Sequence, residues 1–141
     1  MTLLDTDHFS VLRYTDHPRC VSLTAKLAAA HDLPVGTTII TFEEELRGWL
    51  AEIKRSRQIH KQVAVYDRLA KALELFSDWE IIRFDDRAAS EFRRLQQQRI
   101  RIGTQDLKIA SIALVQNALL LSANLIHFRQ VPGLRVENWL D

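Results

Sequence analysis

Apolar and polar residues alternate along the chain in a pattern that predicts strands and helices following one another from end to end. Apolar or β-branched runs bounded by polar or turn-forming residues predict strands. These runs lie at residues 2–6, 37–41, 80–84, 118–122 and 134–136. Helical spacing of apolar side chains predicts helices at residues 22–31, 41–53, 63–76, 85–98 and 105–116. The second of these helices begins at Thr41, where Glu44 three residues later completes a capping-box pattern.

The alternation predicts an α/β fold. The expected strands are short and apolar on both faces, which is typical of parallel strands covered by helices on both sides. We therefore expect a three-layer α/β/α arrangement around a central, mostly parallel sheet. The length of 141 residues suits a single domain over residues 1–141. In such sheets ligands bind beyond the carboxyl ends of the strands, so the search for chemistry begins there.

Composition indicates the cellular environment of the protein more clearly than its function. The chain has 19 Lys and Arg against 18 Asp and Glu, so its net charge neither indicates nor excludes a nucleic-acid partner. Cys20 is the single cysteine, which excludes an internal disulfide and a cysteine-built metal cluster and fits a reducing compartment. No apolar run is long enough to span a bilayer, and the acidic start does not resemble a signal peptide. We expect a cytoplasmic protein without a membrane partner.

Acidic residues follow several of the expected strands. Asp5 ends the first strand, residues 43–45 are three glutamates after the second, and Asp106 opens the helix at 105–116. Each acid has an ordinary explanation as a helix cap or as a partner of a helix dipole. Together at one sheet edge they would repel one another unless a cation neutralised them. Oxygen ligands without cysteine favour Mg²⁺ or Mn²⁺, and such a site suits metal-assisted hydrolysis of phosphodiesters.

Helical geometry separates the three glutamates. Placing successive residues about 100° apart puts Phe42 and the apolar residues that follow it on one buried face. Glu44 is then predicted to point to solvent, whereas Glu45 lies at the edge of the apolar face. A carboxylate on a buried edge needs a partner, because desolvation without one is unfavourable. This pattern favours Glu45 over Glu44 as the functional acid.

Five segments in a fixed order carry a resemblance to a known family. They are LLDTD at residues 3–7, ELRG at 45–48, IGTQDLKIA at 102–110, LSANLIHF at 121–128 and VPGL at 131–134. In this order and spacing the chain resembles PIN-domain ribonucleases of the VapC toxin family over nearly its whole length. The resemblance implies a metal-dependent endoribonuclease acting on single-stranded RNA. It also implies a cognate antitoxin that silences the enzyme and a homodimer.

The resemblance also implies which residues act. Asp5, Glu45 and Asp106 match the acidic metal ligands, and Asn124 stands where the family has Asp or Asn. His127 replaces an Asp found in many members, which leaves one metal or two as an open question. Asp7 occupies a position that is commonly Asn, where it adds a charge or caps a helix.

Candidate RNA contacts lie close to these acids. We assign them to Arg47, Thr6 and His127, with Arg47 favoured because it follows Glu45 so closely. Basic residues are also frequent over residues 47–71 and 93–101, where solvated helix faces explain them equally well. For His127 the alternative is a surface histidine without a contact.

Two alternatives come from other functional classes. A signalling receiver domain shares the doubly wound fold, and Asp85 or Asp86 would be its phosphoacceptor. That chemistry requires a lysine near the last strands, and no lysine follows Lys108. The second alternative is a catalytically inactive interaction module, against which the complete set of acids argues.

Overall fold

A single sheet organises the computed structural model, which describes residues 1–30 and 34–140. Its strands are β1 (Thr2–Leu4), β2 (Val35–Thr38), β3 (Glu80–Ile82), β4 (Leu119–Leu121) and β5 (Arg135–Glu137). They lie in the order β3-β2-β1-β4-β5, and every neighbouring pair is parallel. The strand order therefore reverses between β1 and β4, where a doubly wound sheet forms its ligand-binding crevice.

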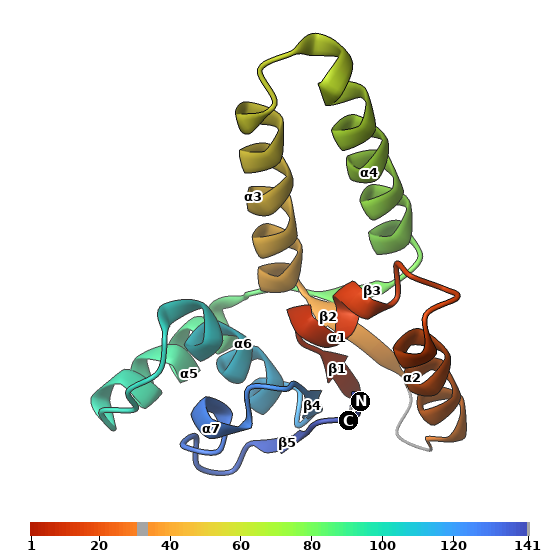
Figure 1. Cartoon of the computed structure of the whole chain (residues 1–141). Coiled ribbons are helices and arrows are strands. Elements are labelled where there is room, and N and C mark those ends of the chain that lie inside the picture. Colours follow the sequence, from red (N-terminus) through yellow and green to blue (C-terminus); the bar gives the residue numbers. More distant parts are fainter. Residues whose placement is uncertain (31–33, 141) are drawn as a thin grey trace.

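Helices cover both faces of this sheet. They are α1 (Thr6–Val11), α2 (Pro18–Ala29), α3 (Ile39–Arg55), α4 (Ile59–Ser77), α5 (Asp86–Gln97), α6 (Thr104–Val115) and α7 (Leu125–Phe128). In Figure 1, α5, α6 and α7 lie on one side of the sheet and α1 and α2 on the other. The antiparallel pair α3 and α4 rises from the sheet as an arm.

Adjacent strand residues supply two separate cores. Leu3 and Leu120 are fully buried in a cluster with residues of α5 and α6. Leu4 and Leu121 point to the opposite face, where they join the cluster that contains Phe9 of α1. Successive side chains of a strand alternate between faces, so one pair of neighbouring leucines serves both layers. The three-layer α/β/α prediction is confirmed.

Some element boundaries differ from the prediction. The strand expected at 37–41 ends at Thr38, and α3 begins at Ile39. The cap is Thr38, whose Oγ1 accepts a hydrogen bond from the amide of Thr41 at 3.2 Å, so the capping box at Thr41 is wrong. The β-branched run 39–41 resembles a strand, but the hydroxyl cap starts a helix there. The helix expected at 105–116 begins one residue earlier, at Thr104, with Gly103 at the cap position.

Other differences concern short or extended elements. The six residues of α1 and the four of α7 were not predicted, because one helical turn carries too little periodicity to recognise. The helix expected at 22–31 begins earlier, at Pro18, which suits the first turn of a helix. His31 lies outside the described residues. Within the described residues no helix is long and apolar enough to cross a membrane.

Candidate active site

Asp5 lies at the point where the strand order reverses. It follows β1 and caps α1, and its Oδ1 accepts a hydrogen bond from the amide of Thr6 at 2.8 Å. Its Oδ2 accepts from the hydroxyl of Ser122, which follows β4, at 2.7 Å. Burial raises the pKa of Asp5 to about 7, and the neighbouring charge of Asp7 adds to the effect. The helix-cap interpretation of Asp5 is therefore confirmed, and the residue also lies where a doubly wound sheet forms its ligand-binding crevice.

Asp106 faces Asp5 from the first turn of α6. Its Oδ2 accepts a hydrogen bond from the side-chain amide of Asn124 at 2.9 Å. His127 lies beyond, with its Nδ1 3.0 Å from the Asn124 amide nitrogen and 3.7 Å from Asp106 Oδ2. Burial raises the pKa of Asp106 in spite of these partners. The structure thus brings Asp106, Asn124 and His127 together, and His127 is not an isolated surface residue.

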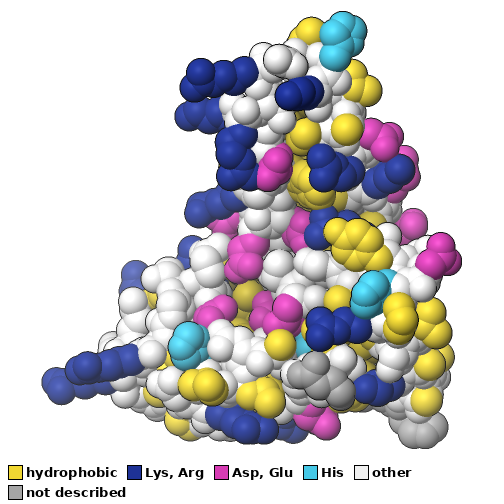
Figure 2. Space-filling view, in the orientation of Figure 1, with side chains coloured by type: hydrophobic (Ala, Val, Ile, Leu, Met, Phe, Trp, Pro, Cys, Tyr) yellow, Lys and Arg dark blue, Asp and Glu magenta, His cyan; other side chains and the backbone are white. Residues whose placement is uncertain are grey.

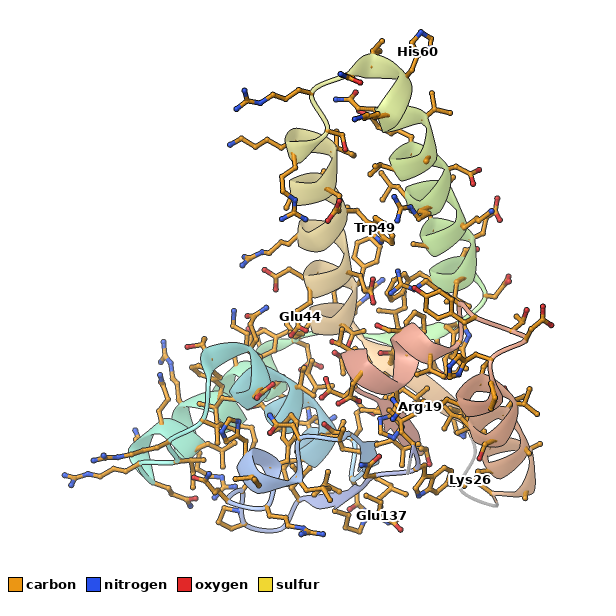
Figure 3. All side chains as sticks on the ribbon, in the orientation of Figure 1. Arg19, Lys26, Glu44, Trp49, His60 and Glu137 are labelled. Carbon is orange, nitrogen blue, oxygen red and sulfur yellow. The ribbon has the colours of Figure 1, made fainter. Side chains whose placement is uncertain are left out.

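Glu44 completes the acidic group, contrary to the helical-wheel prediction. Its Oε2 accepts a hydrogen bond from the hydroxyl of Thr6 at 2.7 Å. Burial raises the pKa of Glu44, and the negative charge of Asp106 raises it further. The prediction that Glu44 faces solvent is wrong, because the start of α3 meets α1 and α6 on a side other than the apolar face shared with α4. Figure 3 shows Glu44 at the base of α3, where the arm meets the sheet.

Glu45 is held by Ser10 of α1 and by Arg13, which follows that helix. Its Oε1 accepts from the hydroxyl of Ser10 at 2.7 Å, and its Oε2 pairs with the guanidinium of Arg13 at 3.2 Å. Only 10% of the Glu45 side chain is exposed. The expectation of a carboxylate at a buried edge that requires a partner is correct, but the partner is Arg13. The structure therefore does not place Glu45 with Asp5 and Asp106.

Asp7 is a further acid of the group. Its Oδ2 accepts a hydrogen bond from the amide of Ala123 at 2.9 Å, which joins the ends of β1 and β4. Its Oδ1 lies 2.6 Å from Nδ1 of His8, a fully buried histidine. Because the charge of Asp7 raises the pKa of both Asp5 and Asp106, all three carboxylates share one electrostatic environment.

The predicted RNA contacts have different surroundings. Arg47 is exposed and forms an ion pair with Glu43. Glu43 also accepts from the side-chain amide of Gln105 at 2.9 Å, and that hydrogen bond lowers the pKa of Glu43. Thr6, by contrast, already uses its hydroxyl to bind Glu44. Arg47 and the half-exposed His127 thus remain at the surface, whereas Thr6 belongs to the scaffold of the acids.

These acids line a hollow at the base of the arm. Figure 2 shows acidic side chains gathered there, with lysine and arginine side chains along one edge of the arm above them. The donor set is chemically suited to a hard divalent cation, since it consists of carboxylate and amide oxygens. Within residues 1–30 and 34–140, no three histidine, cysteine or acidic side chains already converge as one ligand group. Each carboxylate is held instead by a nearby hydroxyl or amide, such as Ser122, Thr6 or Asn124.

Comparison with known proteins gives the family. The model of the PIN domain matches residues 2–134, which is almost the whole chain. The chain belongs to the PIN domain family. Ribonuclease VapC2 of Rickettsia felis is 28% identical to this PIN domain over 141 residues, covering 97% of this chain and 96% of the relative. The resemblance to VapC-type PIN domains is thereby confirmed, and the receiver-domain alternative is wrong. Asp85, its proposed phosphoacceptor, caps α5 by accepting from the amide of Ala88.

Solved structures show the same fold. VapBC2 from Rickettsia felis, bound to a DNA fragment from its promoter, has a TM-score of 0.68 at 24% identity, with 98% of each chain covered. DNA-bound VapBC from Salmonella typhimurium has a TM-score of 0.72 at 21% identity, with 99% of each chain covered. FitAcB from Neisseria gonorrhoeae has a TM-score of 0.70 at 23% identity and covers 99% of this chain and 98% of that one. The PIN fold of this chain therefore extends over its full described length.

Proposed function

We propose that this PIN domain is a Mg²⁺- or Mn²⁺-dependent endoribonuclease that cleaves single-stranded RNA. One observation carries the proposal. Asp5, Glu44 and Asp106 come from three separate elements, and burial raises the pKa of each of them. Clustered carboxylates with raised pKa values are unfavourable for the free protein, and a cation neutralises them. The curated relative carries the name ribonuclease, which indicates the substrate class.

We assign the metal ligands to Asp5, Glu44 and Asp106, with Asn124 as the fourth ligand. Glu44 thus replaces Glu45, which matched the family pattern in the sequence but is bound to Arg13. A bound divalent cation would supply Lewis acidity, which lowers the pKa of water and offsets phosphate charge. The protein groups around the ligands keep them in place: Ser122 holds Asp5, Thr6 holds Glu44 and Asn124 holds Asp106.

We propose two surface residues, Arg47 and His127, as contacts for the RNA. Arg47 extends from α3 one turn beyond Glu43, and 72% of its side chain is exposed. His127 lies next to Asn124, with half of its side chain exposed. We propose that both contact phosphates of the strand on either side of the acids, since cations near the site neutralise the RNA backbone. Thr6 is instead a positioning residue for Glu44.

We further propose that this nuclease is the toxin of a toxin–antitoxin pair in the cytoplasm. Two of the similar solved structures are VapBC complexes, and the curated relative is a VapC. A basic side chain of the antitoxin would neutralise the acids and so silence them. We also propose a homodimer, because α4 leaves large apolar side chains exposed. They include Ile59 at 72%, Val63 at 65% and Leu73 at 61% exposure. A monomer in light scattering at tens of micromolar would contradict the dimer.

The test of the proposed function is a cleavage assay on single-stranded RNA with Mg²⁺, with EDTA as the metal-free control. The parent protein should cut only with the divalent ion, and Asp5→Asn and Asp106→Asn should each abolish cutting. Asp16→Asn, at an exposed position outside the site, is the matched control and should cut at the parental rate. A folded parent that never cuts RNA would favour the inactive interaction module instead.

A further inference from the structure

A second cleft opens directly beside the acids. It has a volume of about 480 Å³ and shares Thr6 and Glu44 with the acidic group. From there it runs along α3 past Gly48, towards α4. Its other lining residues are Arg13, Tyr14, Glu45, Trp49, Glu52, Arg55 and Arg68. Apart from Thr6 and Glu44, the function proposed above assigns no role to the residues of this cleft.

The charges in the cleft are balanced. Three arginines face three glutamates, and two of these pairs are in contact: Arg13 with Glu45, and Arg55 with Glu52. A site for phosphate would carry an excess of cations. The cleft offers guanidinium donors and carboxylate acceptors side by side, so it suits a ligand group whose edges carry both hydrogen-bond acceptors and hydrogen-bond donors. Nucleobases have such edges, which pair with arginine on one side and carboxylates on the other.

The cleft also presents flat surfaces. The guanidinium of Arg13 lies 5.3 Å and that of Arg68 5.7 Å from the ring centre of Trp49. Tyr14 lies at the same cleft with 62% of its surface exposed, and the Arg13 guanidinium is 6.0 Å from its ring. Aromatic rings and guanidinium planes are the groups on which single-stranded bases stack. The indole N–H of Trp49 is buried and has no acceptor among the described residues.

Gly48 keeps the cleft open along α3. A Cβ atom added there would have no atom within 4 Å, so the space beside the helix at this position is empty. Glycine inside a helix is unfavourable, and this one sits in the middle of α3 without a turn or a close contact that requires it. Because no atom stands within 4 Å of that position, a planar ring can approach the surface of the helix there.

We propose that this cleft binds a nucleobase of single-stranded RNA, from a nucleotide next to the phosphate that is cut. The inference rests on the proposed function, because it takes the acids as the cutting site. The base stacks on the ring of Tyr14, and the polar atoms along its edge form hydrogen bonds with the arginines and glutamates of the cleft. The cleft thereby selects the position of the strand relative to the acids.

The test measures binding of a fluorescently labelled 12-nucleotide single-stranded RNA in EDTA, where no cutting occurs. Oligonucleotides that lack one base at each position in turn should show one or two positions at which the parent loses about ten-fold in affinity. The leucine side chain in Gly48→Leu fills the cleft, so this variant should bind the intact strand about ten-fold more weakly than the parent. Removing the base at the sensitive position should then cause no further loss of affinity. Tyr14→Ala should have the same effect, and Tyr66→Ala, at a tyrosine that is 51% exposed and lies outside the cleft, should not.

The same series of variants includes a control for effects on folding. Gly48→Ala and Gly48→Leu both replace a helical glycine in open space, so both should raise the Tm by about 2–4 °C. Gly48→Ala should keep nearly the parental affinity, because a methyl group leaves most of the cleft free. RNA cleavage by the parent together with parental affinity in Gly48→Leu would overturn the cleft assignment and leave the proposed function intact. A parent that neither cuts nor binds RNA would overturn both.

Discussion

Asp7 and His8 form a hydrogen-bonded pair whose proton can be placed from its surroundings. Nε2 of His8 lies 3.0 Å from the backbone nitrogen of Trp139, which can only donate. Nε2 must therefore accept, and in the neutral ring Nδ1 carries the proton that it donates to Asp7 at 2.6 Å. Asp7 accepts a second hydrogen bond from the amide of Ala123. One carboxylate thus connects α1, the end of β4 and the segment after β5.

The pair explains why an aspartate suits this position better than an asparagine would. Asp7 receives two N–H donors on two different oxygens, whereas an asparagine has only one acceptor oxygen. In Asp7→Asn one donor would lose its acceptor at a cost of about 1–3 kcal/mol. The same change relieves repulsion on Asp5, so the single variant alone is ambiguous.

A double-mutant cycle isolates the hydrogen bond. Asp7→Asn should destabilise the parent more than it destabilises His8→Leu, because in that background the histidine donor is already absent. Denaturant unfolding should give a coupling of about 0.5–3 kcal/mol. Strictly additive effects would show that His8 does not contribute to holding Asp7.

Glu44 and Glu45 should separate function from stability. Glu44→Gln removes a charge from the acidic group, so we expect loss of cleavage and of divalent-ion binding with little change in folding. Glu45→Gln breaks the pair with Arg13 and should lower the free energy of unfolding by about 1–3 kcal/mol while the metal affinity stays close to parental. Calorimetry with Mg²⁺ and thermal unfolding in EDTA test the two variants. Equal loss of metal binding in both would return Glu45 to the ligand set.

The metal-free protein should become less stable as pH rises from 5 to 8. The pKa of Asp5 is about 7 in the folded chain and near its ordinary 3.8 in the unfolded chain. Between these values the folded state binds the proton more tightly, so stability falls with increasing pH and levels off above 7. The difference between the two pKa values of Asp5 limits this loss of folding free energy to about 4 kcal/mol. Asp5→Asn should remove most of this dependence, and a parental profile in that variant would place the titration elsewhere.

Mg²⁺ should oppose this pH effect. Ligating carboxylates must be ionised, so the metal competes with the proton and its affinity should rise from pH 5 to about pH 7. Thermal unfolding with Mg²⁺ should therefore show the largest increase in Tm over the EDTA control near neutral pH. An increase that is the same at pH 5 and pH 7 would contradict a site built around Asp5.

The sequence predicted the parts of this structure that depend on long patterns. The parallel sheet follows from the apolar strands, and the end of β1 locates Asp5, whereas Asp106 lies in the first turn of α6, which follows α5 rather than a strand. The choice between Glu44 and Glu45 could not be made in this way. A helical wheel locates the face that packs against α4, but Glu44 faces α1, and α1 is too short to leave a periodic signal. Arg13, which pairs with Glu45, lies just after the same unpredicted helix.

The side-chain amide of Asn124 donates a hydrogen bond to Asp106 at 2.9 Å. In Asn124→Asp that donor becomes a second carboxylate facing the first, so the two should repel in the absence of metal. We expect a lower Tm in EDTA, a larger rise in Tm with Mg²⁺, and tighter divalent binding by calorimetry, because the added charge favours a cation. The free parent should bind one divalent ion per chain, with a second arriving only with RNA phosphates as further ligands.

The matched control for this change is His127→Gln, which keeps a polar side chain beside Asn124 without adding a carboxylate. It should leave the Tm in EDTA and the divalent affinity close to parental, so that any shift in Asn124→Asp is due to the new charge. If Asn124→Asp binds Mg²⁺ no more tightly than the parent, the Asn124 side chain does not face the bound ion. The fourth ligand would then be Asp7, whose charge already raises the pKa of both Asp5 and Asp106.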